Sequence, residues 1–154
     1  MINKEIDNLV LSKFGSKLDK GGYPYIGHLL RVSDNARKLY LDQYDNTEDA
    51  DNIELTGYLH DIIEDTDITA DDLFEYGVPS SVVAGILSVT RQEGESYSEF
   101  IRRAAENPYG RFVKLADLKD NMDITRLQKL DKEDFDRLKK YLKAYHQLIE
   151  SSFS

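Results

Sequence analysis

Apolar residues recur along this chain at intervals of three and four positions, the spacing that places side chains on one face of an α-helix. Ile6, Leu9, Val10 and Phe14 form the first such stripe, and a second begins at Leu29. No convincing run of alternating apolar and polar residues, the pattern of a half-buried β-strand, occurs in the 154 residues. The sequence therefore predicts an all-α fold.

Helix-breaking and helix-capping residues divide the chain into segments. Two glycines and Pro24 interrupt the helical pattern before the second segment, and Thr69 with Asp72 forms a capping pair at the start of a short one. The expected helices span about residues 6–14, 26–44, 47–63, 69–76, 80–90, 96–105, 108–122 and 132–149. Because 154 residues is about the length of one domain, we expect a single domain over residues 1–154, a bundle of six to eight helices.

Composition narrows the chemistry and the partners. The chain has no cysteine, so disulfides, thiolate metal sites and cysteine nucleophiles are excluded, and a metal would have to be held by His, Asp or Glu. A formal net charge of -9 disfavours binding to long nucleic acids and to anionic lipid. The amino-terminal segment has neither an uninterrupted apolar run nor a span long enough to cross a bilayer, so we expect a cytoplasmic protein that binds no membrane.

The third predicted helix carries the strongest functional signal. Its second half is so rich in apolar residues that it should lie at the centre of the fold, yet it ends in His60, Asp61, Glu64 and Asp65. At about 100° per residue, positions 60 and 64, and likewise 61 and 65, lie about 40° apart around the helix, which predicts one polar face two turns long. Burial of ionisable groups there is costly without a partner, and a bound cation would supply one.

Two other segments supply further candidate ligands. His28 lies on the first turn of the second predicted helix, and Asp117 and Asn121 lie one turn apart on an otherwise apolar helix. From the residues alone, Asp117 is as compatible with a position in solvent as with an inward one on a metal. Two imidazoles and two carboxylates form a mixed nitrogen and oxygen set that suits manganese, iron or zinc. Such a set is typical of a hydrolytic metal site.

Together these motifs resemble a known family. A histidine, then His-Asp-x-x-Glu-Asp, then Asp with Asn four positions later is similar to the HD-domain superfamily, and specifically to its RelA/SpoT-type (p)ppGpp hydrolases with their small stand-alone alarmone hydrolases. The resemblance covers residues 17 to about 127 and implies an HD-type helical bundle. The segments that carry it are Gly21-Gly-Tyr-Pro-Tyr-Ile-Gly-His28, Leu59-His-Asp-Ile-Ile-Glu-Asp-Thr66, Tyr76-Gly-Val78, Val89-Thr-Arg91 and Val113-Lys-Leu-Ala-Asp117.

The resemblance also implies roles for the residues of these motifs. The metal ion would be Mn²⁺, and its ligands would be His28, His60, Asp61 and Asp117. The attacking water and the proton transfers would be handled by Glu64 and Asp65. The structural alternative for His28 is a local hydrogen bond at the start of a helix. For Glu64 and Asp65 the alternative is that they begin an acidic loop.

The resemblance places substrate contacts on two further helices. Asn121 would contact the nucleotide sugar, and Arg137 and Tyr141, one turn apart on the last helix, would approach the nucleotide. Their structural alternatives are a helix C-cap for the asparagine and ordinary packing for the other two. Tyr23 and Tyr25, in the loop before the second helix, are further candidates for contact with a base.

Basic residues near the motifs complete the expected site. Where the family has an Arg-Lys pair that packs against the guanine base, this chain has Lys17 and Leu18, and lysine stacks poorly. Lys20 is one of the basic residues nearest the motifs in sequence and is a candidate substrate contact. The others that could join it in an anion-attracting funnel are Arg31, Lys114 and Lys119.

The expected function is hydrolysis of a nucleotide pyrophosphoester with Mn²⁺, most directly release of the 3′-pyrophosphate of (p)ppGpp to leave GDP or GTP. The changed pair Lys17-Leu18 keeps open an HD phosphohydrolase that acts on another nucleotide or phosphoester. A regulatory module that binds metal or nucleotide without turnover is the alternative from another class, although it would not need Glu64 and Asp65. The expected partner is a small-molecule nucleotide, no synthetase half is expected, and the oligomeric state stays undetermined.

Overall fold

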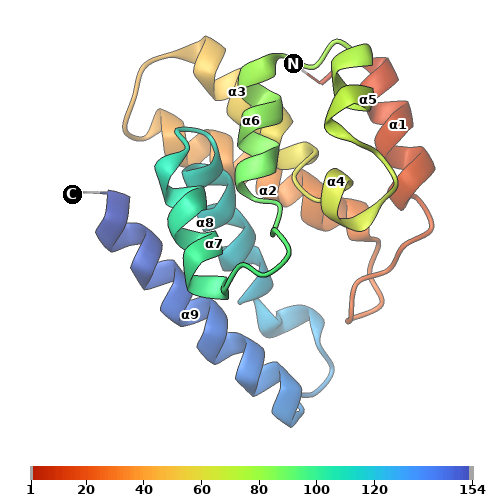
Figure 1. Cartoon of the computed structure of the whole chain (residues 1–154). Coiled ribbons are helices and arrows are strands. Elements are labelled where there is room, and N and C mark those ends of the chain that lie inside the picture. The colour runs from red at the N-terminus through yellow and green to blue at the C-terminus, as the bar shows by residue number, and fades with distance from the viewer. Residues whose placement is uncertain (1, 153–154) are drawn as a thin grey trace.

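The computed structural model describes residues 2–152, and their regular structure is helical throughout (Figure 1). The helices are α1 (Lys4–Phe14), α2 (Tyr25–Leu41), α3 (Thr47–Tyr58), α4 (Ile62–Asp65), α5 (Ala70–Glu75), α6 (Ser80–Ser88), α7 (Tyr97–Glu106), α8 (Gly110–Asn121) and α9 (Lys132–Ser152), with a 3₁₀ turn, η1 (Ile124–Arg126). The described residues form no strand, only a β-bridge between Leu18 and Pro24. The all-α prediction is confirmed, and each expected helix has a counterpart, although the third ends earlier than predicted.

Polar side chains fix where several helices begin. Asn3, Asn46 and Ser96 each accept a hydrogen bond from the backbone N–H three residues later. The predicted pair Thr69 and Asp72 forms a reciprocal capping box, in which each side chain accepts a hydrogen bond from the other residue's backbone N–H. These caps set the register of the helices that follow.

The helices enclose two hydrophobic cores. In the larger one, α2 packs against α3 and α8, and α1, α5 and α6 surround them (Figure 1). The smaller core lies between α7, α8 and α9 and contains Phe100, Leu118 and Leu148. Figure 1 shows α9 along the outer side of α7 and α8. Because α8 contributes side chains to both cores, it joins the two groups of helices.

Helices α2 and α3 approach closely at Gly57. A Cβ atom at this position would lie 2.9 Å from the Cα atom of Ser33, which is too near for any side chain. The Ser33 hydroxyl also donates a 2.7 Å hydrogen bond to the backbone oxygen of Glu54. This contact sets the distance between α2, which carries His28, and the end of α3, which leads to His60.

The prediction of one continuous helix over residues 47–63 is wrong at its end. Helix α3 stops at Tyr58, and residues 59–61 form a turn before the single turn of α4. Here the N–H groups of residues 60 and 62 bond to carbonyls three residues back, the tighter 3₁₀ pattern. Tyr58, Leu59, His60 and Ile62 are all buried, and on a continuous helix they would cover more than half of its circumference. The histidine and acids of this motif therefore do not share one helical face.

The segment between α1 and α2 folds back on itself. The bridge between Leu18 and Pro24 closes it, and Gly22 has a φ of +86°, in the left-handed region that favours glycine. The backbone N–H of Tyr25 donates a 2.9 Å hydrogen bond to the backbone oxygen of Lys17. The loop therefore holds Lys17 beside the first turn of α2.

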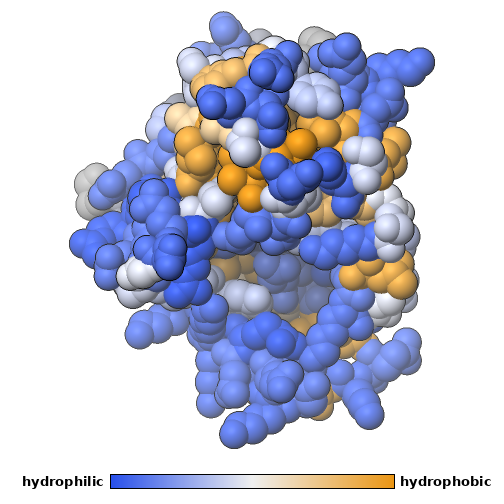
Figure 2. Space-filling model, turned by 45° about the vertical axis from the view of Figure 1, so that its right-hand side comes forward, coloured by the Kyte–Doolittle hydropathy of each residue, from blue (hydrophilic) through white to orange (hydrophobic). Residues whose placement is uncertain are grey.

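Hydrophilic side chains predominate over the lower half of the face shown in Figure 2, where they surround a recess. None of the helices over residues 2–152 combines the length and the apolar character needed to cross a membrane.

Candidate active site

Three separate parts of the chain bring two histidines and two aspartates together. His28 comes from the first turn of α2, His60 and Asp61 from the turn after α3, and Asp117 from α8. Oδ1 of Asp117 lies 3.1 Å from Nε2 of His28 and 3.4 Å from Nε2 of His60. Oδ2 of Asp61 lies 3.2 Å from Nε2 of His60 and 3.9 Å from Nε2 of His28. The four predicted metal ligands therefore lie around one small volume.

The hydrogen bonds of His60 leave one ring nitrogen without a partner. Its Nδ1 lies 2.7 Å from the backbone oxygen of Gly57, which can only accept, so Nδ1 carries the hydrogen and donates. Its Nε2 is buried and has no hydrogen-bond partner. In the neutral ring this atom presents a lone pair toward the carboxylates of Asp61 and Asp117, and a metal ion among them, or a proton on Nε2, would satisfy all three groups. One ligand atom each from His28, His60 and Asp61 lie within 4.8 Å of one another, so the donor set fits a divalent metal ion.

Behind His28 lies a carboxylate that orients it. Nδ1 of His28 is 2.6 Å from Oδ2 of Asp120, and the guanidinium of Arg31 donates a 2.7 Å hydrogen bond from Nε to Oδ1 of the same aspartate. This bond points Nε2 of the histidine toward Asp117, as in carboxylate–histidine–metal arrangements. The salt bridges from Arg31 and Arg126 hold Asp120 in place.

The charges of this cluster shift the pKa values of its members. Burial works against a charged His28, but hydrogen bonds to Asp117 and Asp120 outweigh it and raise the pKa to about 10. Burial also works against a charged His60, but the charge of Asp61, chiefly, outweighs burial and raises the pKa of the ring. Burial would raise the pKa of Asp117, yet the buried Lys114 and the two histidines hold it well below its ordinary value. The site therefore attracts positive charge, as protons or as a metal ion.

Glu64 and Asp65 lie on α4, close to this cluster. Oε1 of Glu64 accepts a 2.7 Å hydrogen bond from the backbone N–H of Arg91, which fixes the carboxylate against the loop after α6. Burial raises the pKa of Asp65, and the charge of Asp61 raises it further. Lys17, whose Nζ lies 3.5 Å from Oδ2 of Asp65, opposes that shift.

An aromatic side chain forms one wall beside these acids. The hydroxyl of Tyr25 donates a 2.5 Å hydrogen bond to Oδ2 of Asp61, and burial raises the pKa of this hydroxyl, so it stays protonated. Nζ of Lys17 lies 4.0 Å from the centre of the Tyr25 ring. Tyr23, the other candidate in this loop, is half exposed.

A polar cleft of about 250 Å³ opens onto the cluster. It lies between the turn after α3, α4, the start of α7, α8 and α9. The side chains that line it are those of Tyr25, Asp61, Glu64, Asp65, Val89, Arg91, Tyr97, Phe100, Lys114, Asp117, Asn121, Lys140 and Tyr141. Nδ2 of Asn121 donates a 3.1 Å hydrogen bond to Oδ1 of Asp117, so the asparagine lies at the edge of the cluster.

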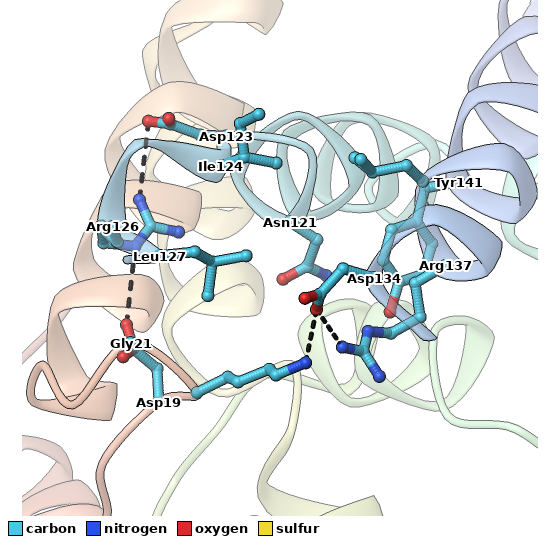
Figure 3. Close-up of a pocket in the computed structure, with 12 residues that line it drawn as sticks. Asp19, Gly21, Asn121, Asp123, Ile124, Arg126, Leu127, Asp134, Arg137 and Tyr141 are labelled. Atoms are coloured by element: carbon cyan, nitrogen blue, oxygen red, sulfur yellow. Dashed lines mark hydrogen bonds and ion pairs between the residues drawn. The ribbon is translucent and has the colours of Figure 1, made fainter. Parts of the chain in front are cut away.

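A second cleft, of about 150 Å³, adjoins the first and shares Asn121 and Tyr141 with it. Figure 3 shows its walls, which come from the loop before α2, from η1 and from the start of α9. The carboxylate of Asp134 is paired with Arg137 (Figure 3) and also with Lys20. Lys20 and Arg137 thus line this second cleft and lie outside the first.

The comparisons with known proteins agree with this geometry. The profile of the family described as "HD domain" matches residues 25–122, which include both histidines and both aspartates of the cluster. The chain belongs to the HD domain family. The family prediction from the sequence motifs is thereby confirmed.

One known protein sequence and one solved structure are similar to this HD domain. A guanosine-3′,5′-bis(diphosphate) 3′-pyrophosphohydrolase of Aquifex aeolicus is 30% identical over 117 residues, which are 71% of this chain. The match spans only 16% of the length of that enzyme. Among solved structures, a metazoan ortholog of SpoT that hydrolyses ppGpp superposes with a TM-score of 0.66 at 22% identity, over 92% of this chain and 82% of the other. The second likeness is one of fold.

Sequence reasoning missed three residues at the site of this HD domain. Asp120 stands three positions after Asp117 on α8, and this helical spacing was a signal that could have found it. Arg91 ends one of the motif segments, but nothing in the spacing indicates that it lies against the Tyr97 ring, as Lys140 of α9 does. Lys140 precedes Tyr141 and carries no sequence signal at all.

The expected funnel of basic residues is only partly formed. Of the four basic residues nearest the motifs, Lys114 alone lines the first cleft, where its Nζ lies 2.9 Å from Oδ2 of Asp117. Lys20 lies in the second cleft, and Arg31 is engaged with Asp120 behind the histidine. Lys119 faces a different groove, formed by α2, α8 and the end of α9, because nearness in sequence does not determine which side of a helix a residue occupies.

Proposed function

We propose that this HD domain is a metal-dependent hydrolase of nucleotide phosphoesters, and that it removes the 3′-pyrophosphate of (p)ppGpp. The observation that carries the proposal is the buried, unpartnered Nε2 of His60, which faces two carboxylates at the floor of a polar cleft. The Aquifex pyrophosphohydrolase supports the choice of substrate, because the matched part of that enzyme is similar to most of this chain.

The metal would be held by His28, His60, Asp61 and Asp117. We propose Mn²⁺ as the ion, since a mixed set of imidazoles and carboxylates suits it. Bound there, it would polarise a phosphoryl oxygen, lower the pKa of water and offset the charge of the substrate. Lys114 would keep Asp117 ionised, and Asp120 would keep His28 correctly turned.

Proton transfer is assigned to the two acids of α4. Glu64, fixed by the backbone N–H of Arg91, would orient the attacking water and accept its proton. Asp65, which burial inclines toward the protonated form, would donate a proton to the leaving 3′-oxygen. Both carboxylates line the cleft, so one bound phosphoester can meet both.

The nucleoside would lie across the boundary of the two clefts. Asn121 and Tyr141 line both, which suits contacts to a sugar that joins the reacting phosphate to the base. Lys20 and Arg137 would approach the part of the nucleotide in the second cleft, after exchange of their bonds to Asp134. Lys17, over the Tyr25 ring, would approach the substrate from the side of α2.

The test combines metal analysis with product analysis. Purified protein is loaded with Mn²⁺ and incubated with ppGpp, and GDP and pyrophosphate are measured with the metal added and withheld. We expect equal amounts of the two products, only with metal. The same assay on a panel of other nucleotides and simple phosphomonoesters identifies the substrate. Turnover of another member of the panel, but not of ppGpp, would show that ppGpp is not the substrate. Metal binding without turnover of any member would contradict an enzyme and favour a regulatory module.

A further inference from the structure

Two basic side chains from distant parts of the chain meet on the ring of Tyr97. Nζ of Lys140, on α9, lies 4.0 Å from the centre of this ring, and Cζ of Arg91, from the loop after α6, lies 5.7 Å from it. All three residues line the first cleft, together with Glu64 and Asp117. The tyrosine thus holds two cations at the cleft that contains the proposed metal site.

Neither of these cations forms a salt bridge among the described residues, although the carboxylate of Glu95, which is paired with Arg103, also interacts with the charge of Arg91. Among the described residues no ion pair to Arg91 or Lys140 is formed, and the guanidinium of Arg91 reaches only a backbone oxygen, that of Glu95, at 3.4 Å. Lys114, by contrast, is paired with Asp117. Two cations without salt bridges that line one cleft can attract an anion.

The same place holds an unused hydrogen-bond donor. The hydroxyl oxygen of Tyr97 is buried and has no hydrogen-bond partner. Burial raises the pKa of this hydroxyl, so it keeps its hydrogen and can donate. An unpaired buried polar group costs free energy that a ligand acceptor would recover.

We propose that Arg91, Lys140 and Tyr97 form a subsite for a second phosphoryl group, and that this subsite makes the enzyme prefer pyrophosphoesters to phosphomonoesters. The reacting phosphoryl group would be served by the metal ligands and by the two acids of α4, which are a separate set of side chains. A further cationic set in the same cleft is needed only by a substrate with a further anionic group. The inference rests on the proposed function and specifies its substrate class.

Binding of inorganic pyrophosphate and of orthophosphate tests the subsite without turnover. Calorimetry on the Mn²⁺-loaded protein, at one fixed concentration of free metal, compares the two anions in wild type, Lys140→Ala, Arg91→Ala and Lys139→Ala. Lys139 is exposed on α9 and does not line the cleft, so it is the matched control. We expect wild type and Lys139→Ala to bind pyrophosphate more tightly than orthophosphate. In Lys140→Ala and in Arg91→Ala the ratio of the two affinities should fall about tenfold.

Tyr97→Phe separates a binding role from a packing role. Because the hydroxyl has no partner in the free protein, its removal should leave the urea midpoint unchanged or higher, while the affinity for pyrophosphate falls. Equal affinity of wild type for the two anions, or equal behaviour of Lys140→Ala and Lys139→Ala, would overturn the subsite. Selective pyrophosphate binding that depends on Lys140, in a protein that hydrolyses no nucleotide, would keep the subsite and refute the proposed function.

Discussion

Nδ1 of His28 lies 2.6 Å from Oδ2 of Asp120, on the side of the ring away from Asp117. The pair joins α2 to α8 and fixes which nitrogen of the imidazole is free for a metal. The carboxylate is itself held by Arg31, so the orientation of the histidine depends on a chain of two bonds.

Replacement of Asp120 should therefore weaken metal binding without removal of a ligand. In Asp120→Asn the imidazole loses its charged partner, and we expect the affinity for Mn²⁺ to fall about 10- to 100-fold. Titration of Mn²⁺ followed by the signal of the free ion measures this. Asp136→Asn, an exposed acid on α9, is the control. Equal affinities in the two variants would show that the outer carboxylate does not support the metal.

The two acids of α4 should affect catalysis and not metal content. We expect Glu64→Gln and Asp65→Asn each to lower kcat about 10²- to 10⁴-fold, the usual contribution of a positioned acid or base. Metal content by mass spectrometry should stay at the wild-type value. In the control Asp71→Asn, which replaces an exposed acid of α5, both kcat and metal content should stay at the wild-type value. Unchanged turnover in either variant would remove that residue from the mechanism.

The close approach at Gly57 predicts a loss of stability on substitution. In Gly57→Ala the new Cβ would meet the Cα of Ser33, which is backbone and can yield only if α2 and α3 move apart. We expect a loss of about 1–3 kcal/mol in the free energy of unfolding, measured with urea. Asn35→Ala, on the exposed side of α2, should change it by less than about 0.5 kcal/mol. The metal affinity of Gly57→Ala should also fall, since the gap between His28 and His60 widens.

An ion pair outside the site gives stability a defined pH dependence. Hydrogen bonds from Arg103 lower the pKa of Glu95 from its ordinary 4.5 to about 2. A lowered folded-state pKa means that the contribution is complete above pH 4.5 and is lost as the pH falls toward 2. The difference in urea midpoint between wild type and Glu95→Gln should therefore be larger at pH 7 than at pH 3. A difference that does not change between these pH values would exclude the pair as the cause.

The helices, and the burial of the two histidines, could be predicted from the sequence for a physical reason. An amphipathic pattern determines which face of each helix is buried, and His28, His60 and Asp117 all lie on buried faces or turns. Ionisable residues at buried positions require partners, which indicates a cation near His60. The convergence of Asp117 with the two histidines is implied by the resemblance to the HD family, because the helix pattern leaves an inward and an outward position equally open. Their roles as ligands remain a prediction that metal analysis must test.

Other features could not be inferred, because they depend on tertiary packing. The turn at residues 59–61 arises from burial on too many sides for one helix, which periodicity alone does not register. The meeting of Arg91 and Lys140 depends on the path of α9 across α7 and α8, and no local pattern encodes it. The same holds for the pairing of Lys20 with Asp134, which lie 114 positions apart.

The pairing of Lys20 with Asp134 bears on how proteins of this fold can differ in the substrate that they prefer. The second cleft is walled by the loop before α2 and by the start of α9, and both lie outside residues 25–122, the part that matches the family. The proposed ligands and both acids lie inside it. In the proposed function, the reacting groups therefore lie inside the matched stretch, whereas much of the wall around the nucleoside lies outside it, so exchange of those outer segments between relatives should change nucleoside preference while the reaction is retained.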